Sequence, residues 1–192
     1  MILTGCTKGE INIPYEKAEN TVEIQALHGT NGKVADFFAK DLTIIPVQSW
    51  DQDEYITASS SLLINHKDKE LVYADNIYKR MYPASLTKLL TALVVIEKAN
   101  LDDLVTISSR ASNILEDGAK LSGFRQGDQI DLESLLNIFL IYSGNDAGIA
   151  LAEHISGSEE AFAKEMNKTA KRIGAVHSNF VNSHGLHDPD HY

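Results

Sequence analysis

The sequence predicts an α+β domain, because a strand–turn–strand pattern is followed along the chain by a run of helical patterns. A chain of 192 residues is long enough for one domain with a hydrophobic core. Its hydrophobic fraction of 43% and charged fraction of 23% are ordinary for a globular protein. We therefore expect one folded domain over residues 55–192.

Residues 1–54 show little sustained periodicity, and we interpret them as a tether plus a packed arm. Within them, Leu3-Thr4-Gly5-Cys6 resembles the lipobox of bacterial lipoproteins, which implies a lipid anchor on Cys6. The five preceding residues are too few for a charged n-region and an apolar h-region. The alternative, an unimportant thiol in a frayed terminus, therefore stays open.

The clearest local patterns begin at residue 56. Residues 56–65 and 70–74 read as strands on either side of a polar turn, which predicts a hairpin. Pro83 then precedes a helix predicted over residues 85–99. Because this helix is apolar nearly all the way round, we expect it to be buried in the middle of the domain.

A second group of helices follows a connecting region, residues 101–127, in which we expect only short helical pieces. The predicted helices cover residues 132–141, 146–155 and 158–174, and residues 179–192 read as a loop. Asp131 and Ser158 are expected to cap two of these helices, and Gly174 is a good residue just past a helix end.

Ser85-Leu86-Thr87-Lys88 carries the first chemical signal. A serine hydroxyl is a poor nucleophile until a neighbour takes its proton, and residues three apart on a helix lie within reach of each other. Burial lowers the pKa of a lysine, so a neutral Lys88 amine is a candidate general base for Ser85. The spacing alone is weak, because an N-cap serine and a snorkelling lysine produce the same pattern.

Ser143-Gly144-Asn145 supplies a second signal between two predicted apolar helices. A loop held between packed helices presents polar groups rigidly. There Ser143 is a candidate proton relay to the leaving amine or to Lys88, and Asn145 a candidate to hold Lys88 and a substrate amide. The alternative is a helix-breaking turn in which Asn145 is a cap.

Together these residues resemble the D-alanyl-D-alanine carboxypeptidases, the low-molecular-mass penicillin-binding proteins, whose motifs are S-x-x-K, S-G-N and K-T-G. The segments that carry the resemblance are residues 80–93, 142–147, 152–158 and 180–186. The resemblance implies a β-lactamase/DD-peptidase-like fold, represented here by its helical part and the hairpin. It also implies that Ser85 attacks the bond between two terminal D-alanines of a peptidoglycan stem peptide, and that β-lactams acylate the same serine.

The third motif of that family, Lys-Thr-Gly on a strand, does not occur in these 192 residues. Lys168-Thr169-Ala170 is a near miss, but it falls inside a predicted helix and is rejected. Without that strand we expect the chain as given to be inactive in turnover. We also expect the hairpin to keep an unpaired edge, which favours self-association.

Two other readings remain in the same structural class. One is a non-catalytic module that binds penicillin or peptidoglycan. The other, less favoured, is a β-lactamase. Glu133-Ser134-Leu135-Leu136-Asn137 matches an E-x-x-L-N element of those enzymes, but here it precedes Ser143 and is predicted to be ordinary helix, which counts against that alternative.

Several classes of partner are not expected. His184, His187, Asp188 and His191 are ligand-type residues, but the resemblance explains His184 as part of a loop near the cleft, so no metal and no cofactor are predicted. The net charge of −10 argues against nucleic acid. No apolar run approaches the roughly 18 residues of a membrane span. The implied substrate places the protein outside the cytoplasm, at the cell wall or membrane-associated.

Overall fold

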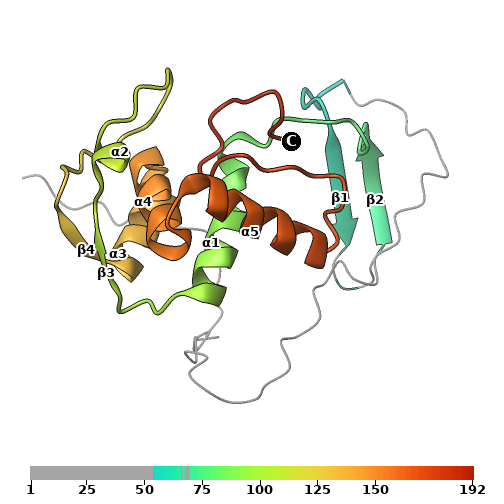
Figure 1. Cartoon of the computed structure of the whole chain (residues 1–192). Helices are drawn as coiled ribbons and strands as arrows, with labels where there is room; N and C mark the ends of the chain where they lie inside the picture. Colours follow the sequence, from blue (N-terminus) through green and yellow to red (C-terminus); the bar gives the residue numbers. More distant parts are fainter. Residues whose placement is uncertain (1–53, 66, 68–69) are drawn as a thin grey trace, which may run out of the picture. The chain divides into compact units, whose positions relative to one another are not determined.

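The computed structural model describes residues 54–65, 67 and 70–192, so the predictions for Cys6 and for the arm lie outside the described residues. Within the described part the fold is α+β, as predicted, with helices packed together and two small antiparallel sheets (Figure 1). No described helix combines the length and the apolar character that crossing a membrane requires.

The predicted hairpin is confirmed as strands β1, Ser61–Asn65, and β2, Glu70–Asp75. The two strands pair antiparallel, with Ser61 opposite Asp75 and a bulge between Leu63 and Ile64. Strand β1 begins five residues later than the periodicity suggested, because residues 56–60 form bends and irregular chain.

A second small sheet was not predicted. Strands β3, Leu104–Thr106, and β4, Gln129–Asp131, pair antiparallel, with a short helix α2, Ser109–Ser112, between them in sequence. Strands of three residues are too short to show alternation in a sequence, so the connecting region read as helical pieces. Val105, at the centre of β3, is buried in the hydrophobic core.

The helices follow in the predicted order with shifted ends. They are a 3₁₀ turn η2 at Ala84–Leu86, α1 at Thr87–Lys98, α3 at Leu132–Asn137, a π-helical turn η3 at Ile138–Tyr142, α4 at Asn145–Ser156 and α5 at Glu159–Arg172. The expected caps are present, since the Asp131 side chain accepts from Ser134 N–H and the Ser158 side chain accepts from Ala161 N–H.

The central helix of the described part is α4 and not α1, which corrects one prediction. Every residue of α4 from Asn145 to Ala152 is buried. Helix α1 packs against α4 and α5 along one side only, and Leu86, Leu89 and Ile96 remain 69%, 66% and 57% exposed. None of the elements that the structure describes covers that apolar face of α1.

The predicted helix over residues 132–141 is two elements in the structure. Helix α3 passes into the π-helical turn η3, where Phe139 is fully buried, and the chain then stops at Ser143. Ser143 has φ of 66°, a left-handed conformation that costs energy in a residue other than glycine. Single π-helical turns inside helices frequently occur at functional sites. Here η3 ends directly before Ser143, which lines the pocket described below.

The Asp146 side chain, near the N-terminus of α4, forms hydrogen bonds with the loop that contains Ser122 and Gly123. Its buried carboxylate accepts hydrogen bonds from Ser122 N–H at 2.6 Å, Ser122 Oγ at 2.9 Å and Gly123 N–H at 3.1 Å. It also accepts from Ala147 N–H at 2.9 Å, which places the negative charge at the helix N-terminus, where the helix dipole favours it.

We therefore expect Asp146→Ala to lower the free energy of unfolding by about 2–4 kcal/mol, because it leaves several backbone and side-chain donors without their acceptor. Urea unfolding measures the change. Asp102→Ala, which removes an exposed carboxylate, is the matched control and should stay within about 0.5 kcal/mol of the wild type. Equal stability of the two variants would contradict the anchoring role of Asp146.

Candidate active site

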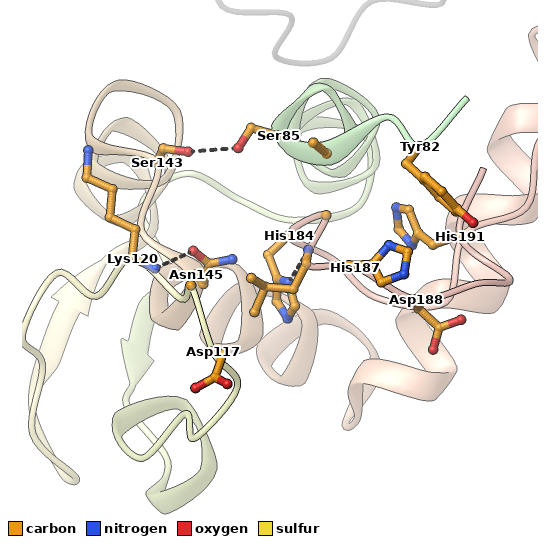
Figure 2. A pocket seen from close by; sticks show the side chains of 14 residues that line it. Tyr82, Ser85, Asp117, Lys120, Ser143, Asn145, His184, His187, Asp188 and His191 are labelled. Atoms are coloured by element: carbon orange, nitrogen blue, oxygen red, sulfur yellow. Dashed lines mark hydrogen bonds between the residues drawn. The ribbon is translucent and has the colours of Figure 1, made fainter. Parts of the chain in front are cut away.

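Ser85 lies in the tight turn that leads into α1. Pro83 fixes the entry, and Leu86 N–H donates to Pro83 O at 3.0 Å, which closes the 3₁₀ turn just before the helix begins at Thr87. Ser85 therefore precedes the α-helix by two residues and does not start it as predicted. Its side chain is exposed, facing a pocket (Figure 2).

Gly185 permits a close approach between this turn and the C-terminal loop. Gly185 has φ of 87°, and a Cβ atom there would lie 1.9 Å from Ala84 O. Only glycine fits such a contact without moving the backbone. The loop around Gly185 therefore packs directly against the turn that carries Ser85.

The structure brings Ser143 to Ser85 across 58 positions of sequence. The two Oγ atoms share a hydrogen bond of 3.3 Å, and Figure 2 shows both hydroxyls pointing toward each other. Gly144 supports this arrangement, since a Cβ atom at that position would lie 2.1 Å from Ser122 Oγ. The pairing of the first two predicted motifs is thus a property of the fold.

Lys88 lies on the first turn of α1 and is only 4% exposed. Its Nζ donates to the His184 carbonyl at 2.6 Å, and among the described residues no hydrogen bond joins it to Ser85. Burial, together with the positive charge of Lys120, lowers the pKa of the Lys88 amine from 10.5 to about 8. The predicted buried amine near Ser85 is therefore present, with a carbonyl as its partner.

Asn145 contacts the backbone of Lys120 instead of the side chain of Lys88. Asn145 Oδ1 accepts from Lys120 N–H at 2.9 Å, and Asn145 N–H donates to Lys120 O at 2.7 Å. The amide nitrogen consequently points away from the Lys120 backbone (Figure 2). The Lys120 ammonium lies 4.3 Å from the centre of the Tyr142 ring, a cation–π distance.

These side chains border one pocket of about 460 Å³. Its lining residues are Tyr82, Ala84, Ser85, Asp117, Gly118, Lys120, Ser143, Asn145, His184, Gly185, Leu186, His187, Asp188 and His191. A concave site with two serine hydroxyls, a lysine, one side-chain amide and several imidazole groups is suited to bind a polar ligand.

Two histidines in the wall have defined hydrogen-bonding roles. Val181 N–H donates to His191 Nδ1 at 3.2 Å, so the ring proton lies on Nε2, which donates to Thr87 Oγ1 at 2.7 Å. Burial lowers the pKa of His191, which favours this neutral form. No group of three or more His, Cys, Asp or Glu side chains within the described residues is placed to hold a metal ion.

His184 is held in the same way. Leu186 N–H donates to His184 Nδ1 at 3.2 Å, so the Nε2 proton is free to donate to Glu159 Oε1 at 3.1 Å. Burial acts to raise the pKa of the Glu159 carboxyl, but hydrogen bonds from His184 and Ser183 outweigh it and lower the pKa to about 2. Glu159 is therefore a carboxylate inside the protein, directly behind the pocket wall.

Lys120 and Glu159 carry no sequence signal that marks them as residues of the site. Lys120 lies in an irregular loop, and Glu159 is one of two adjacent glutamates after a capping serine. His184 was singled out as a loop residue near the cleft, and its carbonyl proves to be the partner of Lys88.

The site combines an exposed serine in the turn before α1 with a buried lysine in the first turn of that helix, inside an α+β fold. The family profile Peptidase S11, D-alanyl-D-alanine carboxypeptidase, matches residues 47–192. The chain belongs to this family.

Individual relatives agree with the family. D-alanyl-D-alanine carboxypeptidase DacF of Bacillus subtilis is 37% identical over 140 residues, which cover 70% of this chain and 35% of the relative. DacA of Haemophilus influenzae is 37% identical over 143 residues, 71% of this chain and 36% of the relative. The chain thus spans about a third of the length of these curated relatives.

Solved structures show the same architecture. Penicillin binding protein 5 from Haemophilus influenzae superposes with a TM-score of 0.67 at 36% identity, covering 74% of this chain and 43% of that chain. Penicillin-Binding Protein D2 from Listeria monocytogenes, in its cefotaxime-bound form, superposes with a TM-score of 0.62 at 26% identity, covering 73% of this chain and 57% of that chain.

Because the charge of Lys120 contributes to the low pKa of Lys88, we expect Lys120→Gln to raise that pKa above about 8. The pKa should remain below 10.5, because burial is the larger cause and persists in the variant. The ¹³Cε chemical shift of Lys88, titrated against pH, measures the change. Lys164→Gln, at an exposed lysine of α5, should leave the titration unmoved.

Glu159→Gln should lower the free energy of unfolding by about 3 kcal/mol at pH 7. The carboxylate has its pKa lowered from 4.5 to about 2 in the folded protein, so its contribution is present above pH 4.5 and is lost as the pH falls toward 2. The stability difference between wild type and variant should therefore shrink over that interval. Denaturant unfolding at several pH values tests this, and a difference that is constant with pH would contradict it.

Proposed function

We propose that the chain carries the acylating residues of a serine-type D-alanyl-D-alanine carboxypeptidase that acts on peptidoglycan stem peptides. The observation that carries this proposal is the 3.3 Å contact between the hydroxyls of Ser85 and Ser143, beside a buried Lys88 whose pKa is lowered to about 8. A pKa near the working pH is the property that a general base requires.

In the proposed reaction, Ser85 Oγ bonds to the carbonyl carbon of the penultimate D-alanine while its proton passes to the neutral Lys88 amine. The tetrahedral intermediate then collapses, the carbon–nitrogen bond breaks, and Ser143 relays the proton held by Lys88 to the departing D-alanine amine, which returns Lys88 to its neutral form. The product is an ester on Ser85. Water hydrolyses that ester, which restores the serine hydroxyl and releases the shortened peptide.

Two groups are proposed to bind and polarise the substrate. The backbone N–H of Ser85 is one donor to the developing oxyanion. The Asn145 side-chain nitrogen, which points away from the Lys120 backbone, is proposed to bind a substrate amide or the Lys88 amine. β-Lactams are proposed to acylate Ser85 by the same first step, in agreement with the cefotaxime-bound form of the Listeria relative.

The setting of the protein follows from this substrate. Stem peptides lie outside the cytoplasm, so we propose an extracytoplasmic protein that faces the cell wall. Lipid attachment at Cys6 is proposed as its means of membrane association. Pairing of two hairpins through an edge of the β1–β2 sheet is proposed as a route to self-association, since the described residues add no third strand to that sheet.

A fluorescent penicillin tests the nucleophile. We expect covalent labelling of the wild-type chain and complete loss of label in Ser85→Ala, because the variant lacks the hydroxyl proposed to form the ester. Ser109→Ala, at an exposed serine of α2, is the matched control and should label like the wild type. Label that persists in Ser85→Ala would falsify the assignment.

The fate of the label separates the related functions. Label that stays, without release of D-alanine from a stem peptide, supports an acylating module; this is the result we expect from these 192 residues, which contain no Lys-Thr-Gly. Release of D-alanine indicates a complete carboxypeptidase. Rapid hydrolysis of the penicillin indicates a β-lactamase, and absence of label contradicts the proposal.

The pH dependence of labelling tests Lys88. If the neutral amine takes the Ser85 proton, the acylation rate should rise with pH and level off above about pH 8, where Lys88 is deprotonated. Lys88→Gln should lower the rate by about 10²–10⁴-fold and remove this rise, because a carboxamide does not take up the proton. Lys164→Gln should preserve both rate and profile.

A further inference from the structure

A buried carboxylate behind the pocket connects three segments of the chain. Glu159 is the first residue of α5, is 8% exposed, and reaches the loop that carries His184. Its Oε1 accepts from Ser183 N–H at 3.3 Å, Ser183 Oγ at 3.1 Å and His184 Nε2 at 3.1 Å. Its Oε2 accepts from Arg110 Nη2 of α2 at 3.3 Å.

The two residues that Glu159 holds also contact α1. The Ser183 carbonyl accepts from Thr91 Oγ1 at 2.6 Å, and the His184 carbonyl accepts from Lys88 Nζ at 2.6 Å. The Ser183 N–H and the side chains of both residues thus face Glu159, while their carbonyls face the buried side of α1. A shift of the turn therefore moves the acceptor of the Lys88 amine.

The position of that amine depends on few other contacts. Lys88 is 4% exposed, and the His184 carbonyl is its hydrogen-bond partner within the described residues. The Phe139 ring lies 5.5 Å from Nζ and supplies packing without an acceptor. Holding a lysine amine at a fixed place in an apolar surrounding requires the acceptor itself to be held.

We propose that Glu159 is a positioning residue for the base of the active site: it fixes the Ser183–His184 turn, and through the His184 carbonyl it sets where the Lys88 amine lies relative to Ser85. This role rests on the proposed function of Lys88. Glu159 itself does not line the pocket and does not contact the substrate.

The charged groups around this arrangement are few within the described residues. Arg110 and His184 face the Glu159 carboxylate. Arg110 in turn interacts with Glu116, at 3.6 Å, and with the exposed Glu160. Lys120 is the charge that acts on Lys88. Replacing Glu159 by glutamine removes the negative charge but keeps an oxygen of similar reach. The variant therefore tests how much the charge strengthens the hydrogen bonds between this side chain and the Ser183–His184 turn.

Stopped-flow labelling with a fluorescent penicillin separates positioning from binding, because it yields both the acylation rate constant and the dissociation constant of the complex that precedes acylation. We expect Glu159→Gln to lower the acylation rate constant about 100-fold, as a displacement of about 1 Å of a catalytic group does. The dissociation constant should change by less than about twofold. The rise of the rate with pH should also move to lower pH, because loss of a firmly held acceptor for its N–H groups favours the neutral form of the Lys88 amine.

Two control variants separate this role from general loss of stability. Glu160→Gln makes the same chemical change at the exposed neighbouring residue and should behave as the wild type. Phe162→Leu destabilises the same helix at a fully buried position without touching the carboxylate, and should keep the wild-type pH profile. A wild-type acylation rate in Glu159→Gln, or the same fall and pH shift in Phe162→Leu, overturns the inference.

The remaining outcomes are also decisive. Where Glu159→Gln does not fold, Ser183→Ala removes only the 3.1 Å hydroxyl contact; about a tenfold loss of acylation rate is expected, and a wild-type rate overturns the inference. Where the wild-type chain takes no label, the proposed function fails, and the ¹³Cε titration of Lys88 decides this inference separately. The pKa of Lys88 should fall in Glu159→Gln and stay in Glu160→Gln, and an unchanged pKa in both overturns it.

Discussion

The hydrogen bond from the Lys88 amine to the His184 carbonyl is the contact on which the arrangement of the site depends. A lysine that is almost completely buried needs an acceptor, because an unpaired amine or ammonium in an apolar surrounding is costly. The His184 carbonyl accepts a hydrogen bond from the amine but carries no negative charge. A carboxylate partner, in contrast, would stabilise the charged ammonium form and raise the pKa. Burial can therefore keep the pKa of Lys88 low while the amine stays in a fixed place.

The same contact explains why the C-terminal loop lies where it does. Gly185 lets the backbone of this loop touch Ala84, and Thr91 and Lys88 both donate to its carbonyls. Glu159 binds the opposite side of the loop. The loop thus connects the first residue of α5 with the N-terminal half of α1, and it lines one side of the pocket.

The N-terminus of α4 organises the other side of the pocket by a similar use of buried polar groups. Asn145 pairs with the Lys120 backbone, and Asp146 accepts from the backbone of the next turn of the same loop. Both residues belong to the central helix of the described part, so the loop is attached to the most buried element. Ser143 lies between η3 and the Gly144 N-cap of α4, so both elements fix its position, and its hydroxyl contacts Ser85.

Local patterns in the sequence were sufficient for the hairpin and for the capped starts of α3 and α5, because each depends on residues a few positions apart. They were insufficient for β3 and β4, whose three residues each are too short to show a period, and for the π-helical turn inside a uniformly apolar segment. Local patterns also led to the wrong prediction that α1 lies at the centre. An apolar surface shows which face a helix can bury, but it does not show whether another element covers that face.

Motif spacing, together with the family resemblance, named Ser85, Lys88, Ser143 and Asn145 as candidate site residues. Tertiary structure alone decided that the Ser143 hydroxyl contacts Ser85 and that the His184 carbonyl accepts from Lys88. It also decided that Glu159 accepts a hydrogen bond from the turn that carries this carbonyl. The physical reason is the range of the interactions. Helical spacing acts within one turn of the chain, whereas the acceptor of Lys88 comes from 96 residues away and is selected by packing and by the need to satisfy every buried polar group.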